Sequence, residues 1–382
     1  MTNFQIDEKH LSQIPALQLL TGLGFEYLTT KEALRQRQGR RSNVLLEDIL
    51  RGQLKEINSI RYKGSEFLFS EENIQSAIQK LKNIKYDGLL KTNEAIYDLI
   101  TLGTALEQTI EGDSKSFTLN YVDWRNPDRN KFHVTVEYGV ERSRSTETIR
   151  PDVVLFVNGI PFCVIECKSP HVDIEQAVSQ SIRNQNDDHI PRLFIYCQMV
   201  LALNKNNAMY ATTGTAAKFW TSWKEPGMKK GEREFEKLQA IVNKPLDKEV
   251  VTKISAAFGV QLELLEEKRL PTEQDKALFA LCRPERLLEL AWKFTVFDGG
   301  VRKIARYQQY FVVKSALARA KHFDVTGSRK GGIIWHTQGS GKSLTMVMLA
   351  LNLALDPEIS NPRIVLVTDR DDLDKQLRDT FT

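Results

Sequence analysis

The sequence predicts an α/β protein, with a mixed-sheet domain followed by an incomplete domain built on a parallel sheet. The spacing of apolar residues changes from a helical to a strand-like period near residue 116. From there strand and helix patterns follow in an order typical of a small mixed α/β domain. Beyond residue 332 strand and helix patterns alternate, and a βαβα run implies a parallel sheet.

The individual elements follow from local patterns. Leu11, Ile14 and Leu17 give residues 8–24 a helical spacing, and Gly24 supplies the stop. Four further amphipathic stretches predict helices: 43–57, 71–82, 92–111 and 172–187. Runs rich in Val, Ile, Phe and Tyr predict strands: 116–124, 131–138, 151–157, 161–168, 192–199 and 207–211.

These elements suggest a domain over residues 1–245, whose end is a charged surface helix or linker. Residues 246–284 are interpreted as a helical connector, and residues 285–382 as a second domain. Its expected elements are two helices, a strand, a third helix and a second strand: 284–295, 303–320, 332–336, a helix from Lys342, and 363–368. The pattern ends at Thr382 within this fold, so we expect the second domain to be incomplete.

Composition narrows the class of protein. The net charge of +4 over 382 residues is small, so any basic surface for nucleic acid must be local. Cys163 and Cys167 would lie roughly 13 Å apart in a strand, too far to share a zinc ion, and are expected in the core. No apolar run reaches membrane-span length and no signal peptide is evident, so we expect a cytoplasmic protein without a membrane partner.

Two neighbouring strand patterns carry a set of charged residues, Asp152, Glu166 and Lys168, around the turn signal Asn158-Gly159. A plain two-residue turn would place residue 152 opposite residue 165, so that Asp152 faces away from Glu166. A three-residue loop or a bulge restores a common face, and Asn-Gly suits a G1 bulge at the turn. If these residues form one site, the hairpin must be bulged.

The residue types suit phosphodiester cleavage. Asp152 and Glu166 on one face would hold a hard divalent cation, and the expected ion is Mg²⁺. The cation would polarise the phosphate and lower the pKa of a water, which Lys168 would orient. The alternative is that Glu166 and Lys168 simply face solvent. The nearly continuous apolar runs around them argue against it, because stray charges in buried strands are costly.

A second motif lies at residues 333–343. Its glycines, followed by Lys342 and Ser343, fit the end of a phosphate-binding loop between a strand and a helix, although His336 stands at the first glycine position. Lys342 would reach the β- and γ-phosphates of ATP, and Ser343 would ligate Mg²⁺. The residues expected to bind the nucleotide here are Thr337, Gly339, Ser340, Gly341, Lys342 and Ser343. A glycine-rich turn without a nucleotide is the alternative.

Both motifs carry a family resemblance. The segment IRPDVVLFVNGIPFCVIECKSP is similar to the PD-(D/E)xK nuclease core of the restriction (R) subunits of type I restriction enzymes. HTQGSGKS is similar to the phosphate-binding loop of their superfamily 2 helicase motor. The resemblance implies a PD-(D/E)xK endonuclease-like domain, followed by part of a RecA-like motor domain.

Further residues are assigned only through this resemblance. Gln180 takes the catalytic Gln of the family's Gln-x-x-x-Tyr helix, whereas Asn184 stands in place of the Tyr. Glu8 is the nearest match to a Glu that the family often places near the metal. RYQQY resembles the adenine-reading Q motif, with Gln308 reading the base and Arg306 or Tyr307 stacking on it. RIVLVTDRDDLDKQL resembles the next helicase motif, with residues near Thr368, Asp369 and Arg370 facing the DNA.

The implied function is that of a type I site-specific deoxyribonuclease. It would combine a metal-dependent double-stranded DNA endonuclease with an ATP-dependent translocase, in a complex with methylase and specificity subunits. The acidic box and arginine finger of the motor are not among the 382 residues, so we expect weak ATP binding without efficient hydrolysis. Two alternatives stay open: a superfamily 2 repair helicase with an accessory nuclease, and a non-catalytic DNA-binding scaffold, which only Asn184 supports.

Overall fold

The computed structural model describes residues 12–261, 265, 267–337 and 339–367. The chain forms two compact units, Met1–Leu288 and Glu289–Thr382. The first unit includes the stretch interpreted as a connector, because α11 (Glu273–Cys282) packs against α1 (Ile14–Gly22). The side chain of Ser12 donates to Gln274, whose amide donates back to the carbonyl of Ser12, and this fastens α11 to the start of α1.

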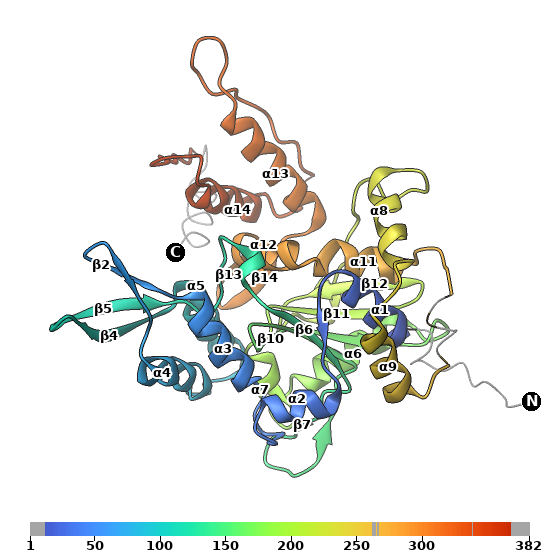
Figure 1. Ribbon diagram of the computed structural model, residues 1–382. Coiled ribbons are helices and arrows are strands. Elements are labelled where there is room, and N and C mark those ends of the chain that lie inside the picture. Colours follow the sequence, from blue (N-terminus) through green and yellow to red (C-terminus); the bar gives the residue numbers. More distant parts are fainter. Residues whose placement is uncertain (1–11, 262–264, 266, 338, 368–382) are drawn as a thin grey trace, which may run out of the picture. The chain divides into compact units, whose positions relative to one another are not determined.

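The first unit is built on a mixed sheet with the strand order β1-β6-β9-β10-β11-β12 (Figure 1). Its strands are Glu26–Tyr27, Phe132–Val136, Val153–Val157, Ile160–Cys167, Met199–Asn204 and Asn207–Ala211 in that order. β1 pairs with β6 and β10 with β11 in parallel, and the other neighbours are antiparallel. The predicted mixed α/β architecture of the first domain is therefore confirmed.

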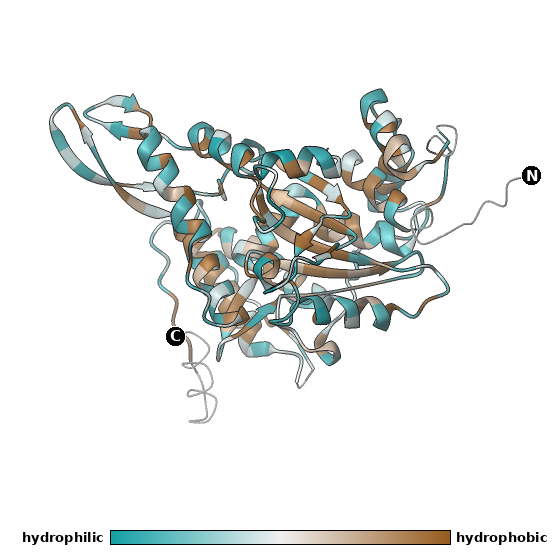
Figure 2. Ribbon diagram, turned by 90° about the horizontal axis from the view of Figure 1, so that it is seen from below, coloured by the Kyte–Doolittle hydropathy of each residue, from teal (hydrophilic) through white to brown (hydrophobic). Residues whose placement is uncertain are grey.

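The two central strands, β9 and β10, are buried along their whole length. This explains why their sequences are continuous apolar runs without polar alternation, as in strands that are covered on both faces. Figure 2 shows hydrophobic residues concentrated along the central strands, with hydrophilic residues on the outer faces of many helices. Helix α6 (Ile174–Asn184) packs on β10 and β11, and Asp173 caps its first turn by accepting a hydrogen bond from the N–H of Glu175.

Further helices and short strands complete the unit. The helices are α2 (Thr30–Gln36), α3 (Glu47–Ile57), α4 (Glu71–Lys82), α5 (Leu89–Leu102), α7 (Pro191–Phe194), α8 (Arg233–Val242) and α9 (Lys248–Phe258). α12 (Pro284–Lys293) follows α11 and begins in the first unit but ends in the second. The remaining strands form hairpins: β2 (Ile60–Tyr62) with β3 (Ser65–Phe67), β4 (Thr104–Ile110) with β5 (Asp113–Leu119), and β7 (Val140–Glu141) with β8 (Thr148–Ile149).

Two predicted elements of the first unit were wrong. The helix predicted over 92–111 ends at Leu102, where Gly103 with a φ of 76° breaks it, and the rest forms β4 of a projecting hairpin (Figure 1). The strand predicted over 192–199 is mostly the short helix α7 and a loop, because Pro191 starts a helical turn. The sheet strand β11 begins only at Met199.

The second unit contains the antiparallel hairpin β13 (Thr295–Asp298) and β14 (Val301–Ile304), then α13 (Tyr307–Lys321) and α14 (Lys342–Leu355). The two helices were predicted, but the described residues of this unit contain no parallel sheet. Residues 332–336 and 363–367 are not strands, and Ile333, Trp335 and Val365 are highly exposed. A strand needs a hydrogen-bonded neighbour, and among the described residues neither segment has one.

Within the part of the chain that the structure describes, no helix combines the length and the apolar character needed to span a membrane.

Candidate functional site

The hairpin between β9 and β10 decides whether the two predicted carboxylates meet. Its turn is Asn158-Gly159, with φ values of 51° and 82°, and Val157 pairs directly with Ile160 across it. The register then shifts between Pro161 and Cys163, so that Cys163 pairs with Leu155 and Ile165 with Val153. Continued by one position, this register sets Glu166 opposite Asp152.

The predicted bulge is thus confirmed, but its predicted place at the turn was wrong. The extra residue is Phe162, three positions beyond Gly159, and not Gly159 itself. Pro161 is the signal that could have located it. Proline has no N–H to offer to a sheet, so a proline inside a central strand is expected at a bulge.

Asp152 and Glu166 form a buried carboxylate pair, with only 7% and 0% of their surfaces exposed. Each of the four carboxylate oxygens accepts an N–H. Asp152 Oδ2 accepts from the backbone N–H of Cys167 at 2.7 Å, and Oδ1 from the side-chain amide of Gln13 at 2.8 Å. Glu166 Oε2 accepts from Gln180 and Oε1 from Asn184, both at 2.8 Å.

The two carboxylates repel each other, and Lys168 offsets part of their charge. Burial and then the neighbouring Asp152 carboxylate raise the pKa of Glu166 well above its usual range, and Lys168 and the Asn184 amide oppose the rise. Gln13, Gln180 and Asn184 donate to the pair through neutral amides, which orient carboxylates without cancelling their charge. A cation at this position would relieve the repulsion.

The donor set suits a hard cation such as Mg²⁺. It consists of carboxylate oxygens, and Gln13 adds a buried amide oxygen, Oε1, that has no hydrogen-bond partner among the described residues. No cluster of three or more His, Cys, Asp or Glu side chains fit to hold a metal occurs in the described part of the chain. Mg²⁺ is usually bound through one or two carboxylates and keeps several waters, so a pair suffices.

Lys168 follows β10 directly and, like Glu166, belongs to the face opposite to Cys167. With Gln180 it lines a hollow of about 560 Å³. Gln180 and Asn184 line a second hollow, of about 600 Å³, and Arg183 borders both. A phosphate in either hollow would lie beside residues that touch Glu166.

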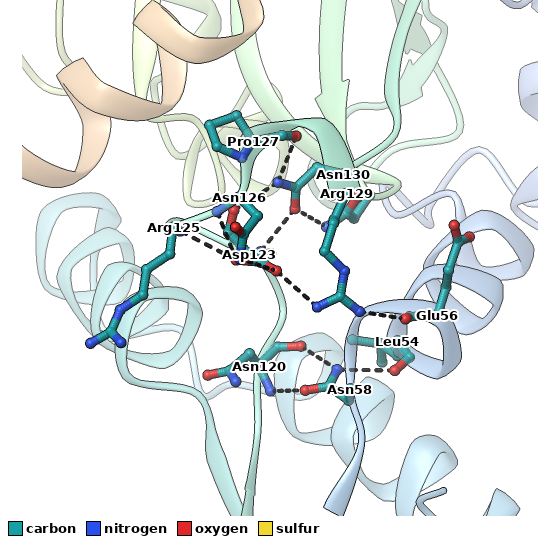
Figure 3. A network of polar contacts seen from close by, with 11 residues as sticks. Leu54, Glu56, Asn58, Asn120, Asp123, Arg125, Asn126, Pro127, Arg129 and Asn130 are labelled. Carbon is teal, nitrogen blue, oxygen red and sulfur yellow. Dashed lines mark hydrogen bonds and ion pairs between the residues drawn. The ribbon is translucent and has the colours of Figure 1, made fainter. Parts of the chain in front are cut away.

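The Asn158-Gly159 turn is held by a polar network, whose part around Asp123 and Asn130 is shown in Figure 3. The side chain of Asn158 donates to Asn130 Oδ1 at 2.8 Å, and Asn130 in turn binds both the N–H and the carbonyl of Asp123. Arg129 joins the Asp123 carboxylate, at 3.1 Å, to the carbonyl of Glu56 at the end of α3. The turn therefore cannot slip without breaking contacts that reach α3.

Sequence reasoning missed two residues of this centre, Gln13 and Asn184. Gln13 comes directly before α1, and no local pattern marks it, because its contact with Asp152 spans 139 positions. Asn184 was treated as a loss of the family's Tyr, although its spacing from Gln180 placed both on one helix face. Glu8, the residue matched to the family's early Glu, lies outside the described residues.

In the second unit, the predicted phosphate-binding loop leads into α14. Gly341, with φ 80° and ψ 41°, caps the helix, and Gly339 also has a positive φ of 76°. Within the loop, the hydroxyl of Ser340 donates to the carbonyl of Thr337 at 2.7 Å. Lys342 and Ser343 form the first turn of α14, as their motif predicts.

Gln309 contacts this loop, while the base-reading role of its neighbour Gln308 stays a prediction. The Gln309 amide donates to the carbonyl of Gly341 at 3.1 Å and its oxygen accepts from the N–H of Arg306, whereas Gln308 is exposed. Two adjacent residues of a helix point in different directions, so that Gln308 and Gln309 of α13 cannot both face the loop. The predicted DNA-facing residues Thr368, Asp369 and Arg370 lie outside the described residues.

Comparisons with known proteins give one match in the first unit and another in the second. Residues 5–219 match the family model "Type I restriction enzyme R protein N terminus", and residues 308–382 match that of the SWI2/SNF2 ATPase. The chain is 29% identical, over 99% of its length, to the type I restriction enzyme HindI endonuclease subunit of Haemophilus influenzae. It is 27% identical, again over 99%, to the putative type I restriction enzyme MjaIXP endonuclease subunit of Methanocaldococcus jannaschii.

The chain spans about a third of the length of these curated relatives, 33% and 34% respectively. The R-protein model alone covers more than half of the 382 residues. Together with the motif order, this coverage shows that the chain belongs to the family of type I restriction enzyme R proteins, whose N-terminal region it matches.

Proposed function

We propose that the first unit is a metal-dependent endonuclease that cuts double-stranded DNA, and that the second unit is part of an ATP-dependent DNA translocase. The observation that carries the nuclease half is the bulge at Phe162. It brings Asp152 and Glu166 onto one face, where all four of their oxygens are oriented by N–H donors. The proposal includes a PD-(D/E)xK fold for the first unit and part of a RecA-like fold for the second, although the described residues of the second unit form no parallel sheet.

The chemistry divides among named residues. Asp152 and Glu166 would hold Mg²⁺, which on binding polarises the scissile phosphate and lowers the pKa of a water. Lys168 donates through its ammonium group to the attacking water and stabilises negative charge that develops on the phosphate. Gln180 holds Glu166 from α6 and borders both hollows, which suits contact with the DNA backbone.

The motor half is proposed from the loop before α14 and the match to the SWI2/SNF2 ATPase. Thr337, Gly339, Ser340 and Gly341 would wrap the phosphates of ATP with backbone N–H groups at a helix N-terminus. Lys342 would contact the β- and γ-phosphates, and Ser343 the Mg²⁺ ion. Gln308 would read the adenine base, and the contact of its neighbour Gln309 with Gly341 joins the start of α13 to the loop.

The partners follow from the relatives. Both are named as endonuclease subunits of restriction enzymes, which supports a complex in which methylase and specificity subunits provide sequence recognition. Such a complex acts on DNA in the cytoplasm, and we propose that location for this chain.

Cleavage of supercoiled plasmid tests the nuclease. The purified chain at stoichiometric amounts with Mn²⁺ should nick or linearise the plasmid, and Lys168→Ala should lower the rate at least about 100-fold while Mn²⁺ binding persists. Arg144→Ala removes a cation that lines neither hollow and serves as the control. A wild-type chain that never cuts, or a Lys168→Ala variant that cuts equally well, would contradict the proposal.

A further inference from the structure

The residue at position 184 holds one oxygen of the proposed metal ligand Glu166. Asn184 Nδ2 donates to Oε1 at 2.8 Å, while Gln180 Nε2 donates to Oε2 at the same distance. Residues 180 and 184 lie one helical turn apart on the same face of α6. The two amides therefore grip the carboxylate from one side, one donor to each oxygen.

The structure holds Asn184 firmly in this position. It is the last residue of α6, only 3% exposed, and its carbonyl accepts from the N–H of Ile190 at 3.1 Å. The next residue, Gln185, ties the helix end to the rest of the unit by accepting from the N–H of Gly214 at 2.7 Å. A side chain with only two rotatable bonds, on a fixed backbone, points reproducibly at its partner.

The chemical nature of the donor matters as much as its place. An Arg or Lys here would neutralise Glu166 and compete with a bound cation. An amide donates a hydrogen bond but has no net charge, so the negative field of the pair stays available to the ion. Gln13 is an amide donor of the same kind on Asp152.

We propose that Asn184 is a positioning residue that, with Gln180, fixes the Glu166 carboxylate in the orientation in which it binds the divalent cation. This inference rests on the proposed nuclease function. It assigns to Asn184 a role in metal binding that does not depend on the aromatic residue the family usually has at this place. Asn184 itself contacts neither the cation nor the DNA in this role.

Direct Mn²⁺ binding to the full chain without nucleotide, followed by electron paramagnetic resonance, tests the proposal. Asn184→Leu keeps a similar volume but removes the donor, and should weaken Mn²⁺ binding about 10- to 100-fold, as is usual when a residue that orients a metal ligand is lost. Asn184→His, which keeps an N–H at a similar position, should stay within about threefold of wild type. Affinity for a DNA duplex in metal-free buffer should not change.

Gln185→Leu is the matched control. Gln185 is an equally buried neighbour on the same helix end, but its amide binds Ser181 and Gly214 and not the carboxylate pair. If Asn184→Leu does not fold, as judged by circular dichroism, Asn184→Ala replaces it, since it also removes the donor.

The outcomes separate the two proposals. Mn²⁺ bound equally well by wild type and Asn184→Leu, or weakened as much by Gln185→Leu, would overturn the role of Asn184 alone. A wild-type chain that binds no Mn²⁺ would overturn the proposed metal-dependent nuclease and this inference with it.

Discussion

Replacing Glu166 by Gln should make the metal-free chain more stable while abolishing cleavage. Glu166 is fully buried beside Asp152, and burial together with this neighbour raises the pKa of Glu166 well above its ordinary value of 4.5. Because the folded-state pKa is raised, the stability that protonated Glu166 contributes is complete below pH 4.5 and is lost as the pH rises through the folded-state pKa. Gln cannot ionise, so the Glu166→Gln variant should not lose this stability as the pH rises.

The expected gain follows from two opposing contributions. Above the folded-state pKa of Glu166 both carboxylates are ionised, and two like charges about 4–6 Å apart repel by about 3–4 kcal/mol at an effective dielectric constant of about 20; Glu166→Gln removes that repulsion. The amides of Gln180 and Asn184 would then bind a neutral oxygen or rotate, which costs about 1 kcal/mol for each hydrogen bond that loses its charge. The net stabilisation is about 1–2 kcal/mol, or a rise in Tm of about 2–6 °C.

The assay is thermal unfolding in EDTA at several pH values from 5 to 9. Wild type should lose stability relative to Glu166→Gln as the pH increases. Added Mn²⁺ should reverse the order, because a ligand that binds only the folded state stabilises it by mass action. Wild type should then gain Tm and Glu166→Gln should not.

A buried carboxylate with cationic partners provides a control, because its replacement by Gln should lower the stability of the chain instead of raising it. Glu225 lies between Arg283 and Arg286 and has a side chain only 6% exposed, so Glu225→Gln should destabilise the chain by about 3 kcal/mol or more. If Glu166→Gln lowers the metal-free Tm as Glu225→Gln does, the repulsion inferred between Asp152 and Glu166 does not outweigh the hydrogen bonds of the ionised Glu166 carboxylate.

Two further predictions concern the glycines and the nucleotide loop. A Cβ at Gly159 would lie 2.6 Å from the carbonyl oxygen of Leu46, so Gly159→Ala should lower the unfolding free energy by about 2–4 kcal/mol. Gly112 has a similar positive φ but open space around it, so Gly112→Ala should cost only about 1 kcal/mol. Equal losses for the two variants in chemical denaturation would refute the close contact at Gly159. Lys342→Ala should lower the affinity for a fluorescent ATP analogue at least about tenfold and leave Mn²⁺ binding at the carboxylate pair unchanged; an unchanged nucleotide affinity would argue against the phosphate-binding loop.

Much of the first unit could be predicted because its signals are local. The apolar runs predict β9 and β10, the Asn158-Gly159 pair predicts the turn between them, and the helical period predicts α6. Each of these signals is contained in a short stretch of the sequence. The two wrong predictions in this unit also have local causes. Gly103 ends a helix that the apolar spacing alone would continue, and Pro191 starts a helical turn within a run of strand-forming residues.

The second unit shows where local patterns are insufficient. Residues 332–336 have the composition of a buried strand, but composition provides no neighbouring strand to pair with. The helices α13 and α14 need only hydrogen bonds within themselves, and they form where predicted.

The residues of the candidate site that lie on the hairpin could be predicted from the sequence, but the bulge that brings them together was predicted at the wrong position. The need for a bulge followed from the two-residue period of a strand, yet its position depended on Pro161. Gln13 could not be found from the sequence, because it reaches Asp152 only after α1 has packed against the sheet. Asn184 shows that a departure from a family pattern can carry a function of its own.

The position of Mn²⁺ in crystals of the chain, located by anomalous scattering, tests the paired-carboxylate centre most directly. We expect one strong peak about 2 Å from a carboxylate oxygen of Asp152 and from one of Glu166, and no such peak in Asp152→Ala. A chain that cuts DNA but binds Mn²⁺ elsewhere, or whose peak survives in Asp152→Ala, would contradict the assignment of these two residues as the metal ligands.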